Sequence, residues 1–200
     1  MKINLIISGV GGQGVITLGM LISQTAISQG ENVIMSEIHG LAQRGGSVSV
    51  DVRIGDFRAP IIPTGDADLV IGMEPLEGER VLDRAGKGTR VIVSTEKMVP
   101  VSLSMKHEEY PDVTGIISSL SKDFEVKQID AVSIAKEAGN YKSANVAILG
   151  FAIGTGWLPL KEQTVREELK KIFSGKALQI NLKALDLGLQ EARSIAQINS

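Results

Sequence analysis

The sequence predicts an α/β fold, with a mostly parallel sheet, helices on both of its faces, an antiparallel excursion at one edge and a helical C-terminal third. Two observations support this prediction. Short apolar runs alternate with stretches of helical spacing over residues 1–140, and turns rich in glycine separate them. From residue 144 onward the apolar spacing is helical. We expect a single domain over 1–200, in which the helices of 144–197 pack on the α/β part of 1–140.

The N-terminal residues predict a βαβ unit. Residues 3–7 are almost continuously apolar, which is typical of a buried strand. The glycine-rich turn 9–14 leads into a helix over 15–28, which Gly30 ends, and residues 33–38 form a second strand. We expect the two strands to be parallel neighbours with a right-handed crossover between them.

A strictly alternating stretch comes next. It turns at Gly55, and its apolar members, which alternate with polar residues, are Val48, Val50, Val52 and Ile54. A period of two predicts a half-exposed strand, and we place it as the antiparallel excursion at the edge of the sheet.

The remaining elements follow from the same patterns. Residues 95–111 are irregular and predict a surface excursion. The predicted strands are 69–73, 90–93 and 126–129, and the predicted helices are 74–84, 130–138, 144–156, 162–173 and 176–197. The last helix has an apolar stripe made of Leu178, Leu182, Leu185, Leu189, Ala192 and Ala196. Such a stripe packs on the chain's own sheet or contacts a partner chain, and we favour the first.

Composition excludes several classes of function. The net charge is −2 with both signs mixed along the chain, so we expect no nucleic acid and no membrane surface as partner. The chain has no cysteine, which excludes a thiolate nucleophile and cysteine-ligated clusters in this chain. The uncharged stretch 143–160 is too short to span a bilayer, and the first apolar run is too short for a signal peptide. We expect a cytoplasmic protein.

The turn between the first strand and the first helix matches the dinucleotide fingerprint, and the fold is therefore Rossmann-like. Its residues are Gly9, Gly11, Gly12, Gln13 and Gly14. Glu37, twenty-three residues beyond Gly14 at the end of the second predicted strand, has the spacing expected of a ribose-binding carboxylate. Gln13 and the bulky loop after Glu37 do not suit an adenosine pocket. We favour a structural or anion-binding turn over tight NAD or FAD binding.

A second distinctive segment consists of Gln43, Arg44, Gly45, Gly46 and Ser47. Paired glycines allow close approach of the backbone, and the guanidinium of Arg44 suits a carboxylate or a phosphate. The alternative interpretation of this segment is a solvated hairpin loop in which Arg44 binds no ligand.

Glu74, directly before Pro75, is a further candidate, and its alternative role is that of a carboxylate at a helix start. All these residues follow predicted strands, so we expect them at the carboxyl edge of the sheet, where ligands and partners bind in such folds. His39 and His107 have no acid or nucleophile at a recognisable spacing. We therefore predict no catalytic residue and no metal site in this chain.

Several motifs together resemble a known family. They are residues 9–14, the string 37–48 with His-Gly-Leu-Ala-Gln-Arg-Gly-Gly, the segments 53–55, 74–77 and 145–150, and the string 181–188. This combination resembles the beta (small) subunit of indolepyruvate ferredoxin oxidoreductases. The gamma subunits of pyruvate and other 2-oxoacid ferredoxin oxidoreductases share the first glycine turn and the Arg-Gly-Gly element. The resemblance covers nearly the whole chain.

The resemblance implies CoA-dependent oxidative decarboxylation of an arylpyruvate, such as indolepyruvate, to an acyl-CoA, with electrons passed to ferredoxin. It implies that thiamine diphosphate and [4Fe-4S] clusters belong to the large (alpha) subunit, which is the expected partner of this chain. The small subunit alone is then inactive, and a homodimer is possible when it is isolated. Leu41 and Leu185 stand where many relatives have Met and Phe. These differences affect the inference about which substrate is used more than the inference about the fold.

Two other functions stay open from the residues alone. One is a stand-alone NAD-dependent oxidoreductase, and the other is a non-catalytic nucleotide-binding module without a large-subunit partner.

Overall fold

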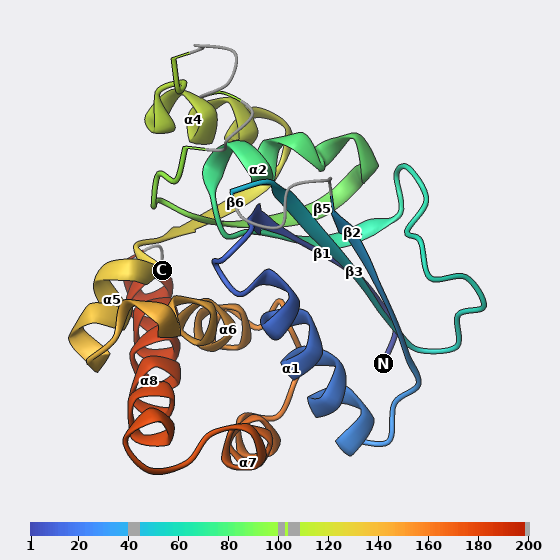
Figure 1. Ribbon diagram of the computed structural model, residues 1–200. Coiled ribbons are helices and arrows are strands. Elements are labelled where there is room, and N and C mark those ends of the chain that lie inside the picture. Colours follow the sequence, from blue (N-terminus) through green and yellow to red (C-terminus); the bar gives the residue numbers. More distant parts are fainter. Residues whose placement is uncertain (40–44, 100–102, 104–108, 199–200) are drawn as a thin grey trace.

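The computed structural model describes residues 1–39, 45–99, 103 and 109–198. Within these residues, strands form one sheet in the order β2-β3-β1-β4-β5-β6, and helices cover both of its faces (Figure 1). The strands are β1 (Ile3–Val10), β2 (Val33–His39), β3 (Ser47–Ile54), β4 (Ala67–Gly72), β5 (Ala85–Ser94) and β6 (Glu125–Ile129). Strands β1, β4, β5 and β6 pair in parallel, whereas β3 is antiparallel to β1 and β2. The predicted fold class is confirmed.

Helices and short 3-10 turns connect the strands and complete the chain. The helices are α1 (Val15–Ser28), α2 (Pro75–Arg80), α4 (Val113–Asp123), α5 (Ala131–Ala138), α6 (Ala144–Gly154), α7 (Glu162–Ile172) and α8 (Gly175–Ile198). The 3-10 turns are η1 (Leu82–Arg84) and η2 (Tyr141–Ser143).

The prediction that β1 and β2 are adjacent in the sheet is wrong. Strand β3 lies between them, so that Leu5 of β1 and Met35 of β2 both pair with Val52 of β3. The connection over 40–46 joins antiparallel strands, because a parallel pair needs a crossover of about a dozen residues or more. Strand β2 is therefore the edge strand, although it runs in the same direction as β1.

The antiparallel excursion at the edge of the sheet is confirmed, with β2 as its outer strand, but the prediction that β3 is half-exposed is wrong. The carboxylate of Asp51 is fully buried and accepts hydrogen bonds from Arg84 Nη1 at 2.7 Å and from the Ile62 N–H at 2.9 Å. Arg53 is buried as well and donates from Nε to Asn4 Oδ1 at 2.9 Å. The polar side chains of this strand are thus paired inside the protein, and their alternation does not mark a solvent-facing surface.

The two faces of the sheet form separate cores. Figure 1 shows α2 and α4 on one side of the sheet and α1, α5, α6, α7 and α8 on the other. The core toward α1 and α6 includes Leu5, Ile7, Ile71, Ile92 and Phe151. The core toward α2 and α4 includes Ile6, Val70, Val91, Leu76, Ile116 and Leu120.

Helix α4 is absent from the predicted elements. Asp112 caps it, accepting the Gly115 N–H at 2.9 Å, and Ile116 and Leu120 are its buried residues. The cap and the spacing of four between these apolar residues are the sequence signals that predict such a helix.

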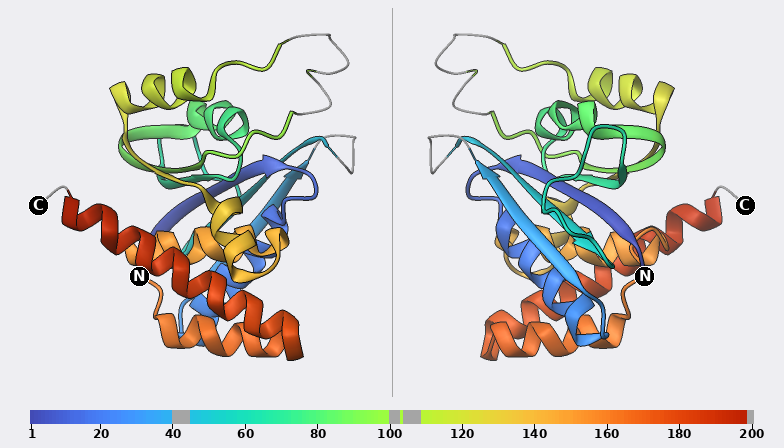
Figure 2. Two further views of the ribbon diagram at one scale, coloured as in Figure 1. Left: turned by 90° about the vertical axis from the view of Figure 1, so that its left-hand side faces the viewer. Right: turned by 90° about the vertical axis from the view of Figure 1, so that its right-hand side faces the viewer.

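The last helix packs mainly on α6, and Figure 2 shows it as the outermost layer on that side of the molecule. Leu185, Leu189 and Ala192 of the predicted apolar stripe are buried. The stripe therefore packs within the chain, as favoured, but it packs on a helix and not on the sheet. Glycines permit the close approach: an added Cβ on Gly150 would overlap the Leu185 carbonyl, and one on Gly188 would overlap the Ala147 carbonyl.

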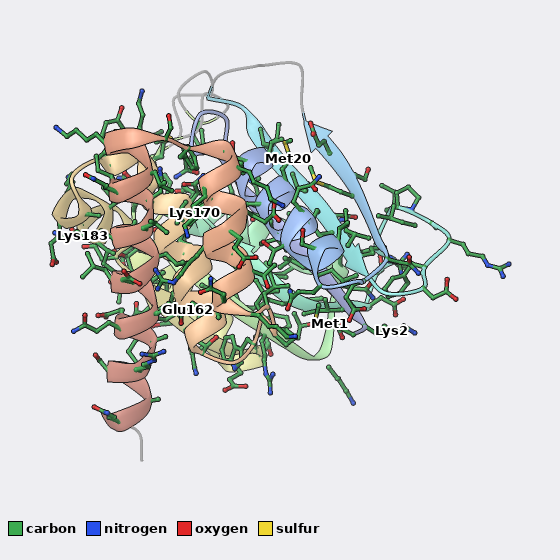
Figure 3. All side chains as sticks on the ribbon, turned by 90° about the horizontal axis from the view of Figure 1, so that it is seen from below. Met1, Lys2, Met20, Glu162, Lys170 and Lys183 are labelled. Carbon is green, nitrogen blue, oxygen red and sulfur yellow. The ribbon has the colours of Figure 1, made fainter. Side chains whose placement is uncertain are left out.

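The outer surface of this layer is charged. Figure 3 shows it from below, with Glu162 and Lys170 on α7 and Lys183 on α8. Arg166 of α7 forms ion pairs with Glu162 on its own helix and with Asp186 on α8. Among the residues that the structure describes, no helix is both long and apolar enough to cross a membrane.

We expect the free energy of unfolding to depend on pH through the carboxylate of Glu168. Glu168 of α7 is buried, and it accepts hydrogen bonds from Ser28 of α1 at 2.7 Å and from Lys171 at 2.6 Å. The hydrogen bond from Lys171 in particular lowers the pKa of Glu168 below its ordinary value of 4.5. Because the folded-state pKa is lowered, the stabilisation is present above pH 4.5 and is lost as the pH falls through the folded-state pKa.

We therefore expect Glu168→Gln to lower the free energy of unfolding by about 1 kcal/mol at neutral pH, with no difference from wild type in strong acid. Urea unfolding at a series of pH values measures this. The control is Glu167→Gln, since Glu167 is exposed and accepts a hydrogen bond from Gln163 on the same helix at 3.2 Å. A Glu168→Gln deficit that persists unchanged in strong acid would contradict the assignment.

Candidate functional site

The carboxyl edge of the sheet brings the candidate segments together. The turn after β1 leads to α1 on one face, and the turn after the neighbouring strand β4 leads to α2 on the other face (Figure 1). The crevice between such strands is the topological switch point, where doubly wound sheets bind their ligands. Because β2 runs parallel to β1, its end and the start of β3 lie at the same edge.

The glycine turn is hydrogen-bonded directly to Gly45 and Gly46, which precede β3. The Gly11 N–H donates to the Gly46 carbonyl at 2.8 Å, and the Gly45 N–H donates to the Gly11 carbonyl at 3.3 Å. Gly14 has a φ of 85°, in the left-handed region that favours glycine, and it precedes the first residue of α1. Two motifs far apart in sequence therefore form one backbone unit.

The side chain of Gln13 bridges the switch point. Its Oε1 accepts the Val10 N–H at 2.8 Å, and its Nε2 donates to the Met73 carbonyl at 3.1 Å. A side chain at Gly9 would clash with it, since an added Cβ would lie 2.7 Å from Gln13 Oε1. The carboxamide thus joins the end of β1 to the end of β4 across the crevice. In a dinucleotide-binding turn, this place is instead taken by free backbone N–H groups that face a pyrophosphate.

Glu37 does not have the position of a ribose-binding carboxylate. In a dinucleotide-binding unit that residue ends the strand beside β1, but here Glu37 lies on the edge strand with β3 in between. This geometry and the bridging Gln13 both weigh against NAD or FAD binding.

Glu74 is fully buried behind the edge, as the N-cap of α2. Its side chain accepts the Glu77 N–H at 2.9 Å, and Pro75 occupies the first helical position. Tyr110 donates a short hydrogen bond from its hydroxyl to Glu74 Oε1. Burial raises the pKa of Glu74, and burial together with the Glu74 carboxylate raises the pKa of Tyr110.

Glu77 is a second buried carboxylate in the same helical turn. It accepts a short hydrogen bond from the Ser47 hydroxyl and another from Arg80 Nη1. Ser47 is the first residue of β3, so this contact links α2 to the start of that strand.

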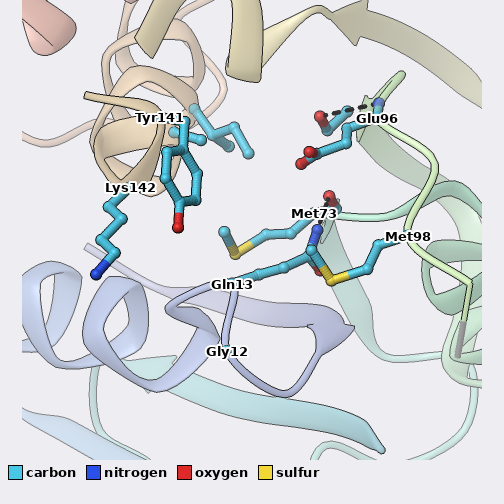
Figure 4. A pocket seen from close by; sticks show the side chains of 10 residues that line it. Gly12, Gln13, Met73, Glu96, Met98, Tyr141 and Lys142 are labelled. Carbon is cyan, nitrogen blue, oxygen red and sulfur yellow. Dashed lines mark hydrogen bonds between the residues drawn. The ribbon is translucent and has the colours of Figure 1, made fainter. Parts of the chain in front are cut away.

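A partly open pocket with a volume of about 110 Å³ lies at the switch point. Figure 4 shows Tyr141 and Lys142 on one side of it, Glu96 and Met98 on the other, and Gln13 and Met73 between them. Its wall combines apolar side chains of methionine, tyrosine and isoleucine with the polar groups of Gln13, Ser94, Glu96 and Lys142. Burial raises the pKa of Glu96, which favours its neutral form.

The structure brings several predicted site residues together. The glycine turn, Gly45, Gly46 and Ser47 meet at the edge, while Glu74 lies beneath it. Gln43 and Arg44 lie outside the described residues, as does the side chain of His39. Glu77, Glu96 and Tyr110 have no role in the sequence-based prediction. For Glu77 the signal is its spacing of three from the N-cap Glu74, which is typical of a capping box, whereas Glu96 and Tyr110 reach the site only through the fold.

The donor groups of this chain do not fit the cofactors that the resemblance implies. Cysteine, the usual ligand of iron–sulfur clusters, is absent from the sequence. Among the described residues, no group of three or more His, Asp or Glu side chains could hold a metal ion such as the magnesium that accompanies a bound diphosphate.

The fold and the edge define the class of protein: an α/β chain with a doubly wound sheet whose distinctive residues meet at the carboxyl edge. The family model for pyruvate ferredoxin/flavodoxin oxidoreductase matches residues 4–191, and the chain belongs to this family.

Relatives and solved structures agree with this assignment. The chain is similar to indolepyruvate oxidoreductase subunit IorB of Archaeoglobus fulgidus, with 40% identity over 97% of both chains. It is 31% identical to ketoisovalerate oxidoreductase subunit VorA of Methanothermobacter marburgensis, over 94% of this chain and 36% of that protein. The crystal structure of pyruvate oxidoreductase subunit PORC from Thermotoga maritima has the same fold, with a TM-score of 0.73, 17% identity and coverage of 94% and 96%.

Proposed function

We propose that this chain is the small subunit of a cytoplasmic 2-oxoacid ferredoxin oxidoreductase that acts on an arylpyruvate such as indolepyruvate. The observation that supports this most is the identity of 40% over 97% of both chains with a subunit named for indolepyruvate. The relative named for the aliphatic ketoisovalerate is less similar, at 31%. The reaction is CoA-dependent oxidative decarboxylation to an acyl-CoA, with the electrons passed to ferredoxin.

The large subunit supplies thiamine diphosphate and the [4Fe-4S] clusters in this proposal. The lack of cysteine here and the lack of a metal-ligating group among the described residues are consistent with that division. This chain contributes its carboxyl edge, which docks on the large subunit. The isolated chain is then inactive, and it either stays a monomer or forms a homodimer until the large subunit binds.

Within the docked edge, the segment Gln43–Ser47 helps to close the approach of substrate or CoA. Its C-terminal end is held by the backbone bonds between Gly11 and Gly45-Gly46. Arg44 directly precedes these glycines, and its guanidinium suits the carboxylate of a 2-oxoacid or the phosphates of CoA.

Co-purification with the large subunit tests the assembly, and Arg44→Ala tests the segment. We expect Arg44→Ala to leave assembly intact and to lower kcat/KM by about 10- to 100-fold, as loss of a charge-assisted bidentate contact does. Turnover and CoA affinity are measured in the reconstituted complex, with Arg58→Ala as control, since Arg58 is exposed in the loop after β3. Unchanged assembly, CoA affinity and turnover for Arg44→Ala would rule out this role of the segment.

A further inference from the structure

We propose that the first turn of α2 is the anchor of the docking edge, with Glu77 as the positioning residue for Ser47 and Glu74 as the positioning residue for Tyr110. Glu77 holds the C-terminal end of the Gln43–Ser47 segment, and Glu74 holds the end of the 95–110 segment. This inference rests on the proposed function, since it assigns the residues that set the geometry of the edge described there.

The first contact is between Glu77 and Ser47. The carboxylate of Glu77 is 1% exposed, and the Ser47 hydroxyl donates to Glu77 Oε2 while Arg80 donates to Oε1. Hydrogen bonds to an ionised acceptor are stronger than neutral ones, and a buried carboxylate retains its partners because an unpaired charge is costly there. Ser47 is the first residue of β3, so this bond restrains the start of that strand, three residues after Arg44 in the sequence.

The second contact is between Glu74 and Tyr110. The Tyr110 hydroxyl donates to Glu74 Oε1 and accepts the Leu76 N–H at 3.4 Å. Lys97, near the start of the same segment, lies with its Nζ 4.6 Å from the centre of the Tyr110 ring. The ring therefore joins α2 to both described ends of the 95–110 segment.

The anchor is itself held by a cap and by close backbone packing. The Glu77 N–H donates to Glu74 Oε2 at 2.9 Å, so that the two carboxylates share one capped turn. The backbone of α2 packs directly against β4, since an added Cβ on Gly72 would lie 2.8 Å from Gly78 Cα. A capped turn packed on the sheet in this way supports Ser47 and Tyr110, as the surroundings of a binding site require.

Tryptic cleavage of the full-length chain after Arg44 tests the first contact. We expect Ser47→Ala to raise the cleavage rate about ten-fold, because loss of one charge-assisted hydrogen bond favours local opening. Global stability, measured by urea unfolding, should stay near that of wild type, and Ser47→Thr should restore the slow cleavage. The control is Ser194→Ala, which removes a hydroxyl bonded to the Gln190 carbonyl on α8.

Tyr110→Phe tests the second contact in the same way, with cleavage after Lys106 as the readout. An increase comparable to that of Ser47→Ala at Arg44 is expected. The anchor is overturned if both cleavage rates stay at the wild-type value. These are the rate after Arg44 in Ser47→Ala and the rate after Lys106 in Tyr110→Phe.

The complex with the large subunit separates this inference from the proposed function. We expect Ser47→Ala to raise the KM for CoA or for the 2-oxoacid about ten-fold with a much smaller change in kcat, and Ser47→Thr to reverse the change. If Arg44→Ala impairs the complex and Ser47→Ala does not, the anchor is refuted while the proposed function stands. If Arg44→Ala has no effect, the role of the segment in the proposed function fails, and the cleavage experiment still decides whether α2 anchors it.

Discussion

Gly188→Ala is expected to destabilise the protein by about 3 kcal/mol, at the upper end of ordinary overpacking effects. Gly188 lies on the face of α8 that packs on α6, and an added Cβ would overlap the Ala147 carbonyl and lie 3.0 Å from the Phe151 nitrogen. These are backbone atoms of a buried helix, so they cannot rotate away as the end of a flexible side chain does. The helices must separate, which opens gaps around Phe151.

Gly115→Ala is the matched control, because it is the same change in another helix. Its added Cβ would meet Asp112 at 3.6 Å, which is ordinary contact, and alanine favours a helix over glycine by about 1 kcal/mol. We expect opposite signs in urea unfolding: loss for Gly188→Ala and a gain of up to about 1 kcal/mol for Gly115→Ala. Equal stability of the two variants would mean that the α6–α8 contact is looser than the structure shows. A single cooperative transition would support our proposal that residues 1–200 form one domain.

Asp51→Ala has the second large expected effect, a loss of about 3 kcal/mol in the free energy of unfolding. The carboxylate is fully buried in β3 and bonded to Arg84 and to the Ile62 N–H. Removing it leaves the guanidinium of Arg84, 13% exposed, without this partner, and leaves a buried N–H unpaired.

The control for Asp51→Ala is Glu125→Ala at the edge of the sheet. Glu125 pairs with Arg90 at 3.4 Å, but the two side chains are 61% and 49% exposed, so we expect a loss below about 0.5 kcal/mol. Thermal or urea unfolding measures both. A loss for Asp51→Ala as small as that for Glu125→Ala would contradict the buried pair.

The sequence predicts most elements of the fold but not the order of its strands. Helix α1 is predicted at its observed bounds, because its apolar spacing and Gly30 are local signals. The insertion of β3 between β1 and β2 depends on non-local pairing. The polar residues Asp51 and Arg53 indicate solvent in the sequence alone, whereas Arg84 and the loop before β4 cover them in the fold.

The candidate site is predictable to the same degree. Residues that follow strands can be assigned to the carboxyl edge from topology alone, and the glycine turn and Gly45-Gly46 do meet there. The bond between Glu74 and Tyr110 is not predictable, because Tyr110 is 36 residues away in a segment without periodicity. Long-range side-chain pairs of this kind leave no local pattern in a single sequence.

The hairpin formed by β2 and β3 has a consequence for evolution and for engineering. Both ends of its tip are held by the strand ladder, which pairs His39 with Val48 and continues without interruption to Val33 and Ile54. Residues of the tip can therefore be exchanged between relatives while the ladder, and the core beneath it, stay as they are. We therefore expect chimeras that carry the tip of a relative to keep the fold, which allows the proposed role of the Gln43–Ser47 segment to be tested separately from stability.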